Sequence, residues 1–361
     1  MIQRILVALL VLATVFAGVP APVAAADQAE QCSFPMTVTD ATGTEVNISE
    51  DPSRIVTTNP SAAQTMWEIG AKDEVVGVSQ YAMYLDGANE KTNVSGSSGL
   101  NVEAVIGLEP DLVLVPNTSY TAEPDRVEQL REAGLAVVVF ETGDSLDAVA
   151  NKTERIGKLT GNCEAGEKRA DEMRTSIENM ERALEDAERP VGLNAFFGYT
   201  SGANTFISDV MVTGGLRNGA AEANITGFAQ INDELVVDMD PEYIVIPSHA
   251  PRPSSPAYNS TTAMKEGNVI VVDANKLQQP APRAIEASET IMKAVHPDAY
   301  ERYLELQNES AATTEAPQTT ETPATEAPET TEQTTETGAP GFGAVVSLVA
   351  LAGVALLARL R

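Results

Sequence analysis

Residues 100–117 read LNVEAVIGLEPDLVLVPN, and residues 231–248 read INDELVVDMDPEYIVIPS. The second stretch follows the first at a constant offset of 131 positions (231 − 100). Five positions are identical: Asn101/Asn232, Glu103/Glu234, Val105/Val236, Pro110/Pro241 and Pro116/Pro247. Each stretch predicts a short helix, a turn and an apolar strand. A chain that repeats this unit is expected to fold into two related lobes.

Strand and helix patterns alternate on both sides of one long helical segment. A hairpin is expected at 36–48, and apolar runs such as LAVVVF (135–140) and NVIVVD (268–273) predict strands between helices. This alternation is typical of α/β lobes with mostly parallel, Rossmann-like sheets. The chain has 361 residues, enough for two such domains. We expect an N-terminal lobe at 36–160 and a C-terminal lobe at 190–306.

The segment 163–189 departs from this alternation. Its apolar residues step by three and four on an otherwise charged sequence that ends at Pro190, which predicts one long amphipathic helix. Such a helix is too long for an ordinary crossover in a small sheet. We therefore expect it to join the two lobes as a rigid connection.

Both ends of the chain differ from its middle. Residues 1–26 have the basic, apolar and small-residue zones of a signal peptide, with a retained membrane anchor as the alternative. Residues 309–339 are Thr, Glu, Pro and Ala and predict a disordered stalk. The segment 340–361, with Pro-Gly-Phe, an apolar run and a basic end, resembles the archaeal surface-sorting signal that is cut and replaced by lipid. The alternative is a retained peptide anchor.

Composition narrows the possible partners. The net charge is −29, which excludes nucleic acid and an anionic membrane surface as partners of the folded part and is typical of a halophilic source. The two cysteines, Cys32 and Cys163, are most simply a disulfide in an oxidising compartment, with two free thiols as the alternative. Sequons begin at seven candidate glycosylation sites: Asn47, Asn93, Asn117, Asn151, Asn224, Asn259 and Asn308.

The Asn-x-Glu at the head of both repeats has two readings. Asn101 and Asn232 fit helix N-caps, and Glu103 and Glu234 fit the first turn, where a carboxylate meets the positive end of the helix. Capping and charge stabilisation of the helix would by themselves explain why both residues are present. Because the motif is duplicated, the two carboxylates would also form a matched pair, suited to a two-fold symmetric partner that offers a cation to each lobe.

DPSRIVTTNPSAAQTMWEIGAKDEVVGVSQYAMY, EAVIGLEPDLVLVPN and QPAPR resemble the cobalamin and ferric-siderophore class of periplasmic substrate-binding proteins of ABC importers. The resemblance covers about residues 36–305 and is nearest to the cobalamin-binding members. It implies a helical-backbone binding protein whose Glu103 and Glu234 dock on arginines of a dimeric permease with its ATPase. This sequence lacks the cleft tryptophans common in such members, since its only Trp is Trp67.

The cleft is expected between the lobes, at the carboxyl ends of the strands. Candidate ligand-binding residues on loops there are Asn59, Tyr81, Tyr84, Asn117, Phe197, Tyr199, Ser201, His249 and Arg283. We expect Phe196 to point into the sheet instead. Flat aromatic faces with neutral hydrogen-bonding groups suit cobalamin or a related corrinoid as the transported ligand, with no cofactor of the protein's own. A ferric siderophore or heme is the alternative.

Other classes of protein fit less well. The chain has no nucleophile elbow, no phosphate-binding Gly loop and only two His, so we expect no enzyme and no metal site. A surface adhesion protein would explain the stalk but not the duplicated lobes. We expect a monomer that meets the membrane only through its C-terminal anchor.

Overall fold

The computed structural model describes residues 32–97 and 99–315. A five-stranded, all-parallel sheet forms the centre of the N-terminal lobe, in the order β5-β4-β3-β8-β9. Its strands are β3 (Ile55–Thr57), β4 (Val75–Val78), β5 (Thr92–Asn93), β8 (Leu112–Pro116) and β9 (Val137–Phe140). β8 and β9 are apolar almost throughout because helices cover both faces of a parallel sheet.

The helices of this lobe are short, and two begin with an asparagine cap. They are α1 (Pro60–Glu68), α2 (Val102–Gly107), α3 (Asn117–Ala122) and α4 (Pro124–Glu132). Single 3-10 turns lie at Lys72–Glu74, Gln80–Ala82 and Ala88–Glu90. The expected hairpin is present as β1 (Met36–Thr39) and β2 (Glu45–Ile48), and a second small hairpin pairs β6 (Ser95–Gly96) with β7 (Gly99–Leu100).

The C-terminal lobe has a four-stranded parallel sheet in the order β12-β10-β14-β15. Its strands are β10 (Val191–Asn194), β12 (Arg217–Asn218), β14 (Tyr243–Pro247) and β15 (Val269–Val272), with a separate antiparallel pair of β11 (Tyr199–Ser201) and β13 (Phe228–Gln230). The helices are α7 (Phe206–Thr213), α8 (Gly219–Glu222), α9 (Asp233–Met239), α10 (Pro256–Ser260), α11 (Thr262–Glu266), α12 (Ala274–Leu277) and α13 (Ala284–Val295). The predicted α/β class with mostly parallel sheets is therefore confirmed.

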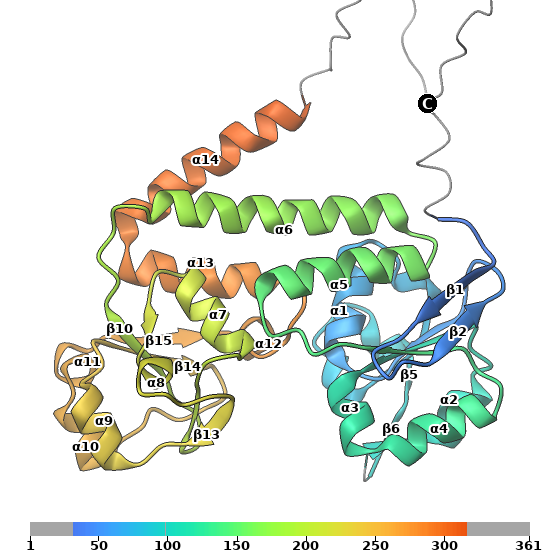
Figure 1. Ribbon diagram of the computed structural model, residues 1–361, viewed down its shortest axis with the longest axis horizontal. Helices are drawn as coiled ribbons and strands as arrows, with labels where there is room; N and C mark the ends of the chain where they lie inside the picture. Colours follow the sequence, from blue (N-terminus) through green and yellow to red (C-terminus); the bar gives the residue numbers. More distant parts are fainter. Residues whose placement is uncertain (1–31, 98, 316–361) are drawn as a thin grey trace, which may run out of the picture. The chain divides into compact units, whose positions relative to one another are not determined.

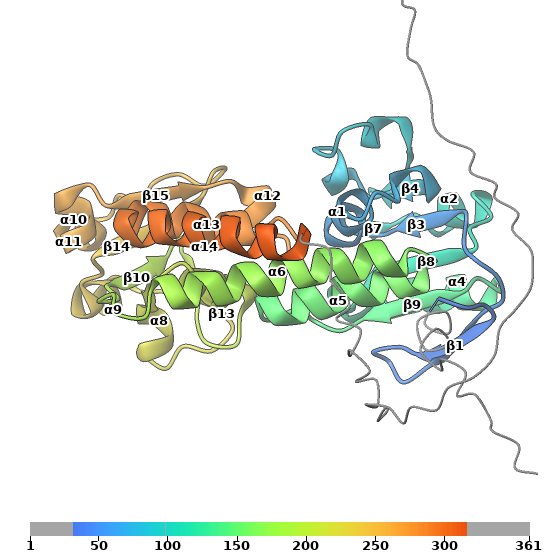
Figure 2. The ribbon, with the colours of Figure 1, turned by 90° about the horizontal axis from the view of Figure 1, so that it is seen from above.

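Two antiparallel helices, not one, bridge the lobes. α5 (Leu146–Leu159) was not expected, and α6 (Cys163–Ala183) is shorter than the predicted 163–189 because the chain turns at Leu184. The carbonyl of Ala183 accepts a hydrogen bond of 2.7 Å from Arg302 in place of a further helical turn. Figure 1 shows α6 running across both lobes, and Figure 2 shows α5 alongside it.

Glycines let α5 and α6 approach closely. A Cβ added at Gly157 would lie 2.7 Å from Cα of Gly166, and one added at Gly166 would lie 2.8 Å from Cα of Gly157. No side chain fits at either position, so backbone packs on backbone where the helices cross. This contact fixes the spacing between α5 and α6 near the N-terminal lobe.

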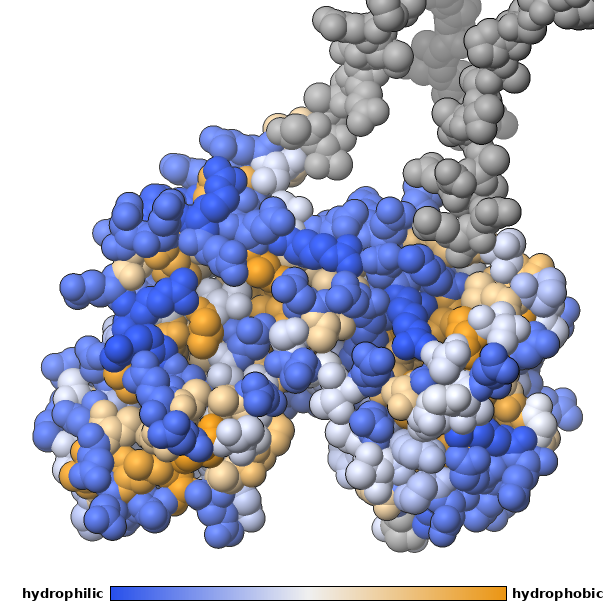
Figure 3. Space-filling model, in the orientation of Figure 1, coloured by the Kyte–Doolittle hydropathy of each residue, from blue (hydrophilic) through white to orange (hydrophobic). Residues whose placement is uncertain are grey.

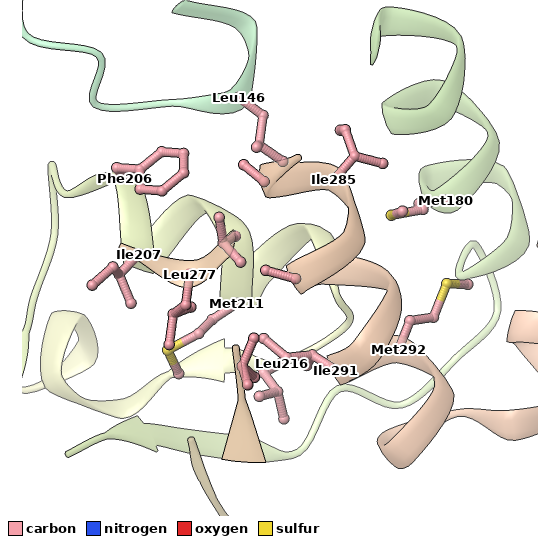
Figure 4. Close-up of a cluster of buried hydrophobic side chains, with 14 of the residues drawn as sticks. Leu146, Met180, Phe206, Ile207, Met211, Leu216, Leu277, Ile285, Ile291 and Met292 are labelled. Atoms are coloured by element: carbon pink, nitrogen blue, oxygen red, sulfur yellow. The ribbon is translucent and has the colours of Figure 1, made fainter. Parts of the chain in front are cut away.

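The bridging helices enter the cores of both lobes. Leu146 at the start of α5 and Met180 of α6 are buried with Phe206 and Met211 of α7 and Ile291 of α13 in the C-terminal lobe (Figure 4). The other end of α5 is buried in the N-terminal lobe through Ile156 and Leu159. A connection buried at both ends resists bending, because bending would open well-packed cores.

The repeated sequence folds as a repeated unit. Asn101 caps α2 by accepting from the amide of Ala104 at 3.0 Å, and Asn232 caps α9 by accepting from the amide of Leu235 at 2.8 Å. Each helix is followed by an acidic residue at positive φ, Glu109 at 46° and Asp240 at 40°, ahead of the proline that leads into the strand. The two copies thus share cap, turn and strand.

The apolar pattern near the end of the C-terminal lobe predicts one closing helix at about 284–305, but the structure has two. Pro297 separates α13 from α14 (Pro297–Glu315), and α14 continues past 309, into the segment predicted as a stalk. The remainder of the predicted stalk, the signal peptide at 1–26 and the anchor at 340–361 lie outside the described residues. Within the described residues no helix is both long and apolar enough to span a membrane. Cys32 and Cys163 form the expected disulfide.

Candidate functional site

A cavity of about 730 Å³ lies between the two lobes, and both contribute to its wall. The N-terminal lobe supplies the starts of α1 and α3 and the loop after β9, while the C-terminal lobe supplies β11, β13 and the loops before α7 and after α12. The space-filling view shows the molecule hollowed between the lobes on the side away from α6 (Figure 3). Its size is typical of a small-molecule site. We refer to it as the central cavity.

Aromatic side chains form much of the wall of the central cavity. Three of them are unusually exposed for their size: Tyr81 at 68%, Phe228 at 60% and Tyr199 at 41%. The ring of Phe196 lies 6.2 Å from that of Tyr199 and 6.3 Å, edge-on, from that of Phe228. Exposed aromatic rings gathered at one cavity indicate a binding surface for a flat, apolar solute.

The polar groups of the wall are mostly neutral. Asn117 donates to Thr142 Oγ1 at 3.3 Å, and Asn59 caps α1 by accepting from the amide of Ala62 at 3.2 Å. The charged lining residues are Glu141, Asp144 and Lys152. Within residues 32–97 and 99–315, the lining contains no arginine and no histidine. The cavity therefore favours an uncharged ligand over one that carries several carboxylates or phenolates.

Lys152 holds the two lobes together at the edge of the cavity. Its ammonium group contacts Ser61 Oγ at 3.4 Å on the N-terminal side and donates to the carbonyl of Pro280 on the C-terminal side. Burial lowers the pKa of Lys152 from its ordinary value of 10.5 to about 8. Desolvation is the cause, since it disfavours the charged form of an amine.

Four of the nine candidate ligand residues line the central cavity. They are Asn59, Tyr81, Asn117 and Tyr199. Each follows a strand or starts a helix at the carboxyl edge of a sheet, where the topology was expected to place the cleft. Their role in binding stays a prediction, because position alone does not establish ligand contact.

Two of the other five candidates make their side-chain hydrogen bonds within one lobe. Tyr84 packs against the N-terminal core, and its hydroxyl accepts from Gln64 Nε2 at 2.7 Å. Ser201 is fully buried and donates to Asn194 Oδ1 at 2.8 Å. Both were expected at the cleft because they follow strands, but each side chain is occupied by a neighbour in its own lobe.

Arg283 lies behind the cavity and not in its wall. Its Nε contacts Glu68 Oε1 at 2.7 Å, and its amide donates to Gln64 Oε1 at 3.0 Å. It therefore joins the C-terminal lobe to α1, as does Arg169, which contacts Glu68 Oε2 at 3.3 Å and the carbonyl of Pro282 at 3.2 Å. Arg283 therefore stabilises the contact between the lobes and is not placed to bind a ligand in the central cavity.

Phe197 and His249 meet outside the central cavity. Phe197 stands at the tip of a tight turn with φ of 49°, is 60% exposed, and its ring lies 5.7 Å from that of His249. The prediction for the two neighbouring phenylalanines was reversed: Phe196, expected to point into the sheet, lines the cavity, and Phe197 does not. Phe196 pairs with Tyr199 across a two-residue turn, and Phe197 and Gly198, both at positive φ, form the tip of that turn.

The structure also adds residues that sequence reasoning missed. Phe140, Phe206, Phe228 and Lys152 line the cavity. Phe228 reaches it because β13 pairs antiparallel with β11, with Ser201 opposite Phe228. The two partners are 27 positions apart (228 − 201), so no local pattern in the sequence indicates the pairing.

The carboxylates of the repeated motif are both exposed. Glu103 and Glu234 lie in the first turns of α2 and α9, and neither makes an ion pair in the structure as described. In Figure 1 the two helices lie toward the side of the lobes that faces away from α6. This arrangement leaves both acids available to a partner that approaches the open side of the cavity.

Two lobes bridged by paired helices around an aromatic cavity define the class of two-lobed solute-binding proteins. Residues 55–276 match the family described as periplasmic binding protein. A relative named cobalamin-binding protein, from Halobacterium salinarum, is 42% identical over 98% of this chain and 97% of its own length. An uncharacterized ABC transporter substrate-binding lipoprotein of Bacillus subtilis is 30% identical over 81% of this chain and 96% of its own. The chain belongs to the periplasmic binding protein family.

Solved structures show the same fold. The vitamin B12 binding protein of Vibrio cholerae has a TM-score of 0.60 at 22% identity, covering 69% of this chain and 98% of its own. A periplasmic heme-binding protein of Roseiflexus has a TM-score of 0.62 at 23% identity, covering 68% of this chain and 99% of its own. Residues 339–361 match the PGF-CTERM motif, so the protein is anchored at the extracellular face of the cell membrane through its C-terminus.

Proposed function

We propose that this protein is the extracellular solute-binding component of an ABC importer, and that it captures cobalamin or a related corrinoid between its lobes. The observation that carries the proposal is the central cavity, walled by aromatic rings from both lobes and lined without arginine or histidine in the part of the chain described. The 42% identical relative named for cobalamin binding supports the same ligand.

The chemistry of the cavity fits a corrinoid better than the alternative ligands. A corrinoid is a broad macrocycle with a fringe of neutral amides, so it needs flat apolar contacts and neutral hydrogen-bonding groups. Heme and ferric siderophores, the alternative ligands, carry carboxylates or anionic chelating groups and are commonly held by arginines or by an axial Tyr or His. Tyr81 and Tyr199 remain the lining residues able to give an axial oxygen, so heme is the ligand to compare first.

The test is a titration of the purified folded part with cobalamin, cobinamide, heme and a ferric siderophore. We expect submicromolar to micromolar affinity for the corrinoids and at least tenfold weaker binding of heme and siderophore. Absence of corrinoid binding at micromolar concentration would contradict the proposal and favour the iron-carrying alternative.

We further propose that Glu103 and Glu234 dock this protein on a dimeric permease with its ATPase. The support is their equivalence in the repeat, their exposure and the shared side of α2 and α9. The double variant Glu103→Ala with Glu234→Ala is expected to abolish uptake while ligand affinity is unchanged. Glu222→Ala with Glu132→Ala removes two other acids and serves as the matched control. Normal uptake in the docking variant would remove this role.

The remaining expectations belong to the same proposal. The protein acts as a monomeric carrier without catalytic activity or a cofactor of its own, and it binds no nucleic acid. Glycosylation is proposed at the exposed sequon residues Asn47, Asn93, Asn151, Asn224, Asn259 and Asn308. Asn117 is half-buried in the cavity wall, where a glycan would compete with the ligand. Peptide mass spectrometry of the native protein tests each site.

A further inference from the structure

A second, smaller cavity opens beside the central cavity in the N-terminal lobe. It has a volume of about 340 Å³ and lies between the 3-10 turn after β4, the β6–β7 hairpin and α3. It shares four wall residues with the central cavity: Asn59, Pro60, Tyr81 and Thr118. A substituent on a ligand in the central cavity can therefore reach it. We refer to it as the side pocket.

The side pocket is polar where the central cavity is aromatic. Its lining residues include Ser79, Ser95, Ser97, Thr118 and Ser119, and Ser95 Oγ accepts from the amide of Gln80 at 2.9 Å. Ser79 is only 3% exposed, and its Oγ is buried with no hydrogen-bond partner among the described residues. An unsatisfied buried hydroxyl is costly. The Ser79 side chain would therefore gain a hydrogen bond by turning toward a ligand group in the pocket.

One acidic residue sets the charge of this pocket. Among the residues that the structure describes, Glu123 is the only charged residue in its wall, and its carboxylate accepts from the amide of Leu100 at 3.0 Å. Gly99 provides the space: a Cβ there would lie 1.7 Å from Glu123 Oε1. Arg126 Nε lies 3.5 Å from the carboxylate but is not part of the wall. A group that enters the pocket therefore meets hydrogen-bonding side chains and the carboxylate of Glu123, whose partner Arg126 lies outside the wall formed by the described residues.

We propose that the side pocket is a subsite for an uncharged hydrogen-bonding substituent of the ligand, and that Glu123 excludes a carboxylate there. The inference rests on the proposed function, because it assumes a ligand in the central cavity. For a corrinoid the substituent is an amide side chain of the ring, which presents N–H donors, whereas the nucleotide tail carries an anionic phosphodiester and does not fit the proposal. A carboxylate in the same place would face Glu123 and be repelled.

The charge test compares cyanocobalamin with its monocarboxylate derivatives, in which one ring amide is hydrolysed to an acid. We expect the wild type to bind at least one of these acids about tenfold more weakly than the parent amide, and Glu123→Gln to remove most of that difference. Gln keeps an acceptor for the Leu100 amide, so the fold is preserved. Asp125→Asn removes the same charge two residues away, outside the pocket, and is expected to leave the ratio unchanged.

The occupancy test fills the pocket and distinguishes a ring amide from the nucleotide tail. Ser119→Leu narrows the pocket, and Thr121→Leu, on an exposed position of the same helix, is its control. If Ser119→Leu weakens cobalamin and cobinamide about equally, a ring amide occupies the pocket, as proposed. If it weakens cobalamin but not cobinamide, the nucleotide tail with its anionic phosphodiester occupies the pocket, and the proposal of an uncharged subsite is overturned.

The outcomes that overturn the subsite differ from those that overturn the proposed function. Failure of the wild type to bind any corrinoid contradicts the function and removes the subsite with it. The subsite alone is overturned if the wild type binds corrinoids normally and two further results hold. Glu123→Gln leaves the ratio of the affinities for the amide and the acid unchanged, and Ser119→Leu leaves the corrinoid affinities unchanged. Circular dichroism of each variant confirms that folding is retained.

Discussion

Replacing Lys152 by Met should change how the stability of the protein depends on pH. The ammonium group contacts Ser61 and Pro280 from opposite lobes and has no carboxylate partner among the described residues. Burial brings its pKa to about 8, from an ordinary value of 10.5. The wild type therefore carries a desolvation cost at neutral pH that the Met variant lacks.

The direction and size of this pH dependence follow from the pKa values of Lys152 in the folded and unfolded states. Below pH 8 the amine is charged in both the folded and unfolded states, and the full cost is present. Between pH 8 and 10.5 the folded state has lost the proton while the unfolded state keeps it, so wild-type stability rises with pH. The free energy of unfolding of the wild type minus that of Lys152→Met should rise by about 3 kcal/mol across this window.

Urea denaturation of both proteins at several pH values from 7 to 10 measures this difference. Subtracting the variant removes the contribution of other titrating groups, including Tyr258, whose pKa burial raises to about 12. The pH dependence should persist in high salt, because its cause is burial and not an exposed charge pair. A stability difference that stays constant from pH 7 to 10 would refute the reasoning.

Three further outcomes are expected. Phe228→Ala or Tyr199→Ala should weaken ligand binding by about 1.5–3 kcal/mol through lost apolar contact. Phe197 has the same 60% exposure as Phe228 but lies outside the cavity, so Phe197→Ala should leave ligand affinity unchanged. Equal losses of affinity in all three variants would contradict the cavity wall described. Replacing Cys32 and Cys163 by Ser removes the disulfide and should lower the free energy of unfolding by about 2–4 kcal/mol. An unchanged midpoint of urea denaturation would argue against a stabilising role of this disulfide. Small-angle scattering of free and ligand-bound protein should give nearly equal radii of gyration, because α5 is buried in the cores of both lobes and packs along α6. A large contraction on ligand binding would show a flexible bridge.

Much of the fold could be predicted from local pattern. The repeat at 100–117 and 231–248 predicted paired helix-turn-strand units, and both copies form with the expected Asn101 and Asn232 caps. The continuous apolar runs predicted the parallel strands because strands covered on both faces have no polar side to show. The bridge was predicted less completely: α5 was missed, and α6 ends at Ala183, whose carbonyl accepts from Arg302, a residue distant in sequence.

Sequence by itself therefore determined the class of this protein: two α/β lobes, a helical connection, a repeated carboxylate and a surface-anchoring tail. Only the tertiary structure decided which side chains meet in the cavity. Phe196 rather than Phe197 lines it, Phe228 joins it through the pairing of β13 with β11, and Arg283 leaves it for Glu68. The reason is physical: helices and strands follow from neighbours along the chain, whereas a cavity wall is assembled from segments far apart in sequence, and their register is fixed by packing.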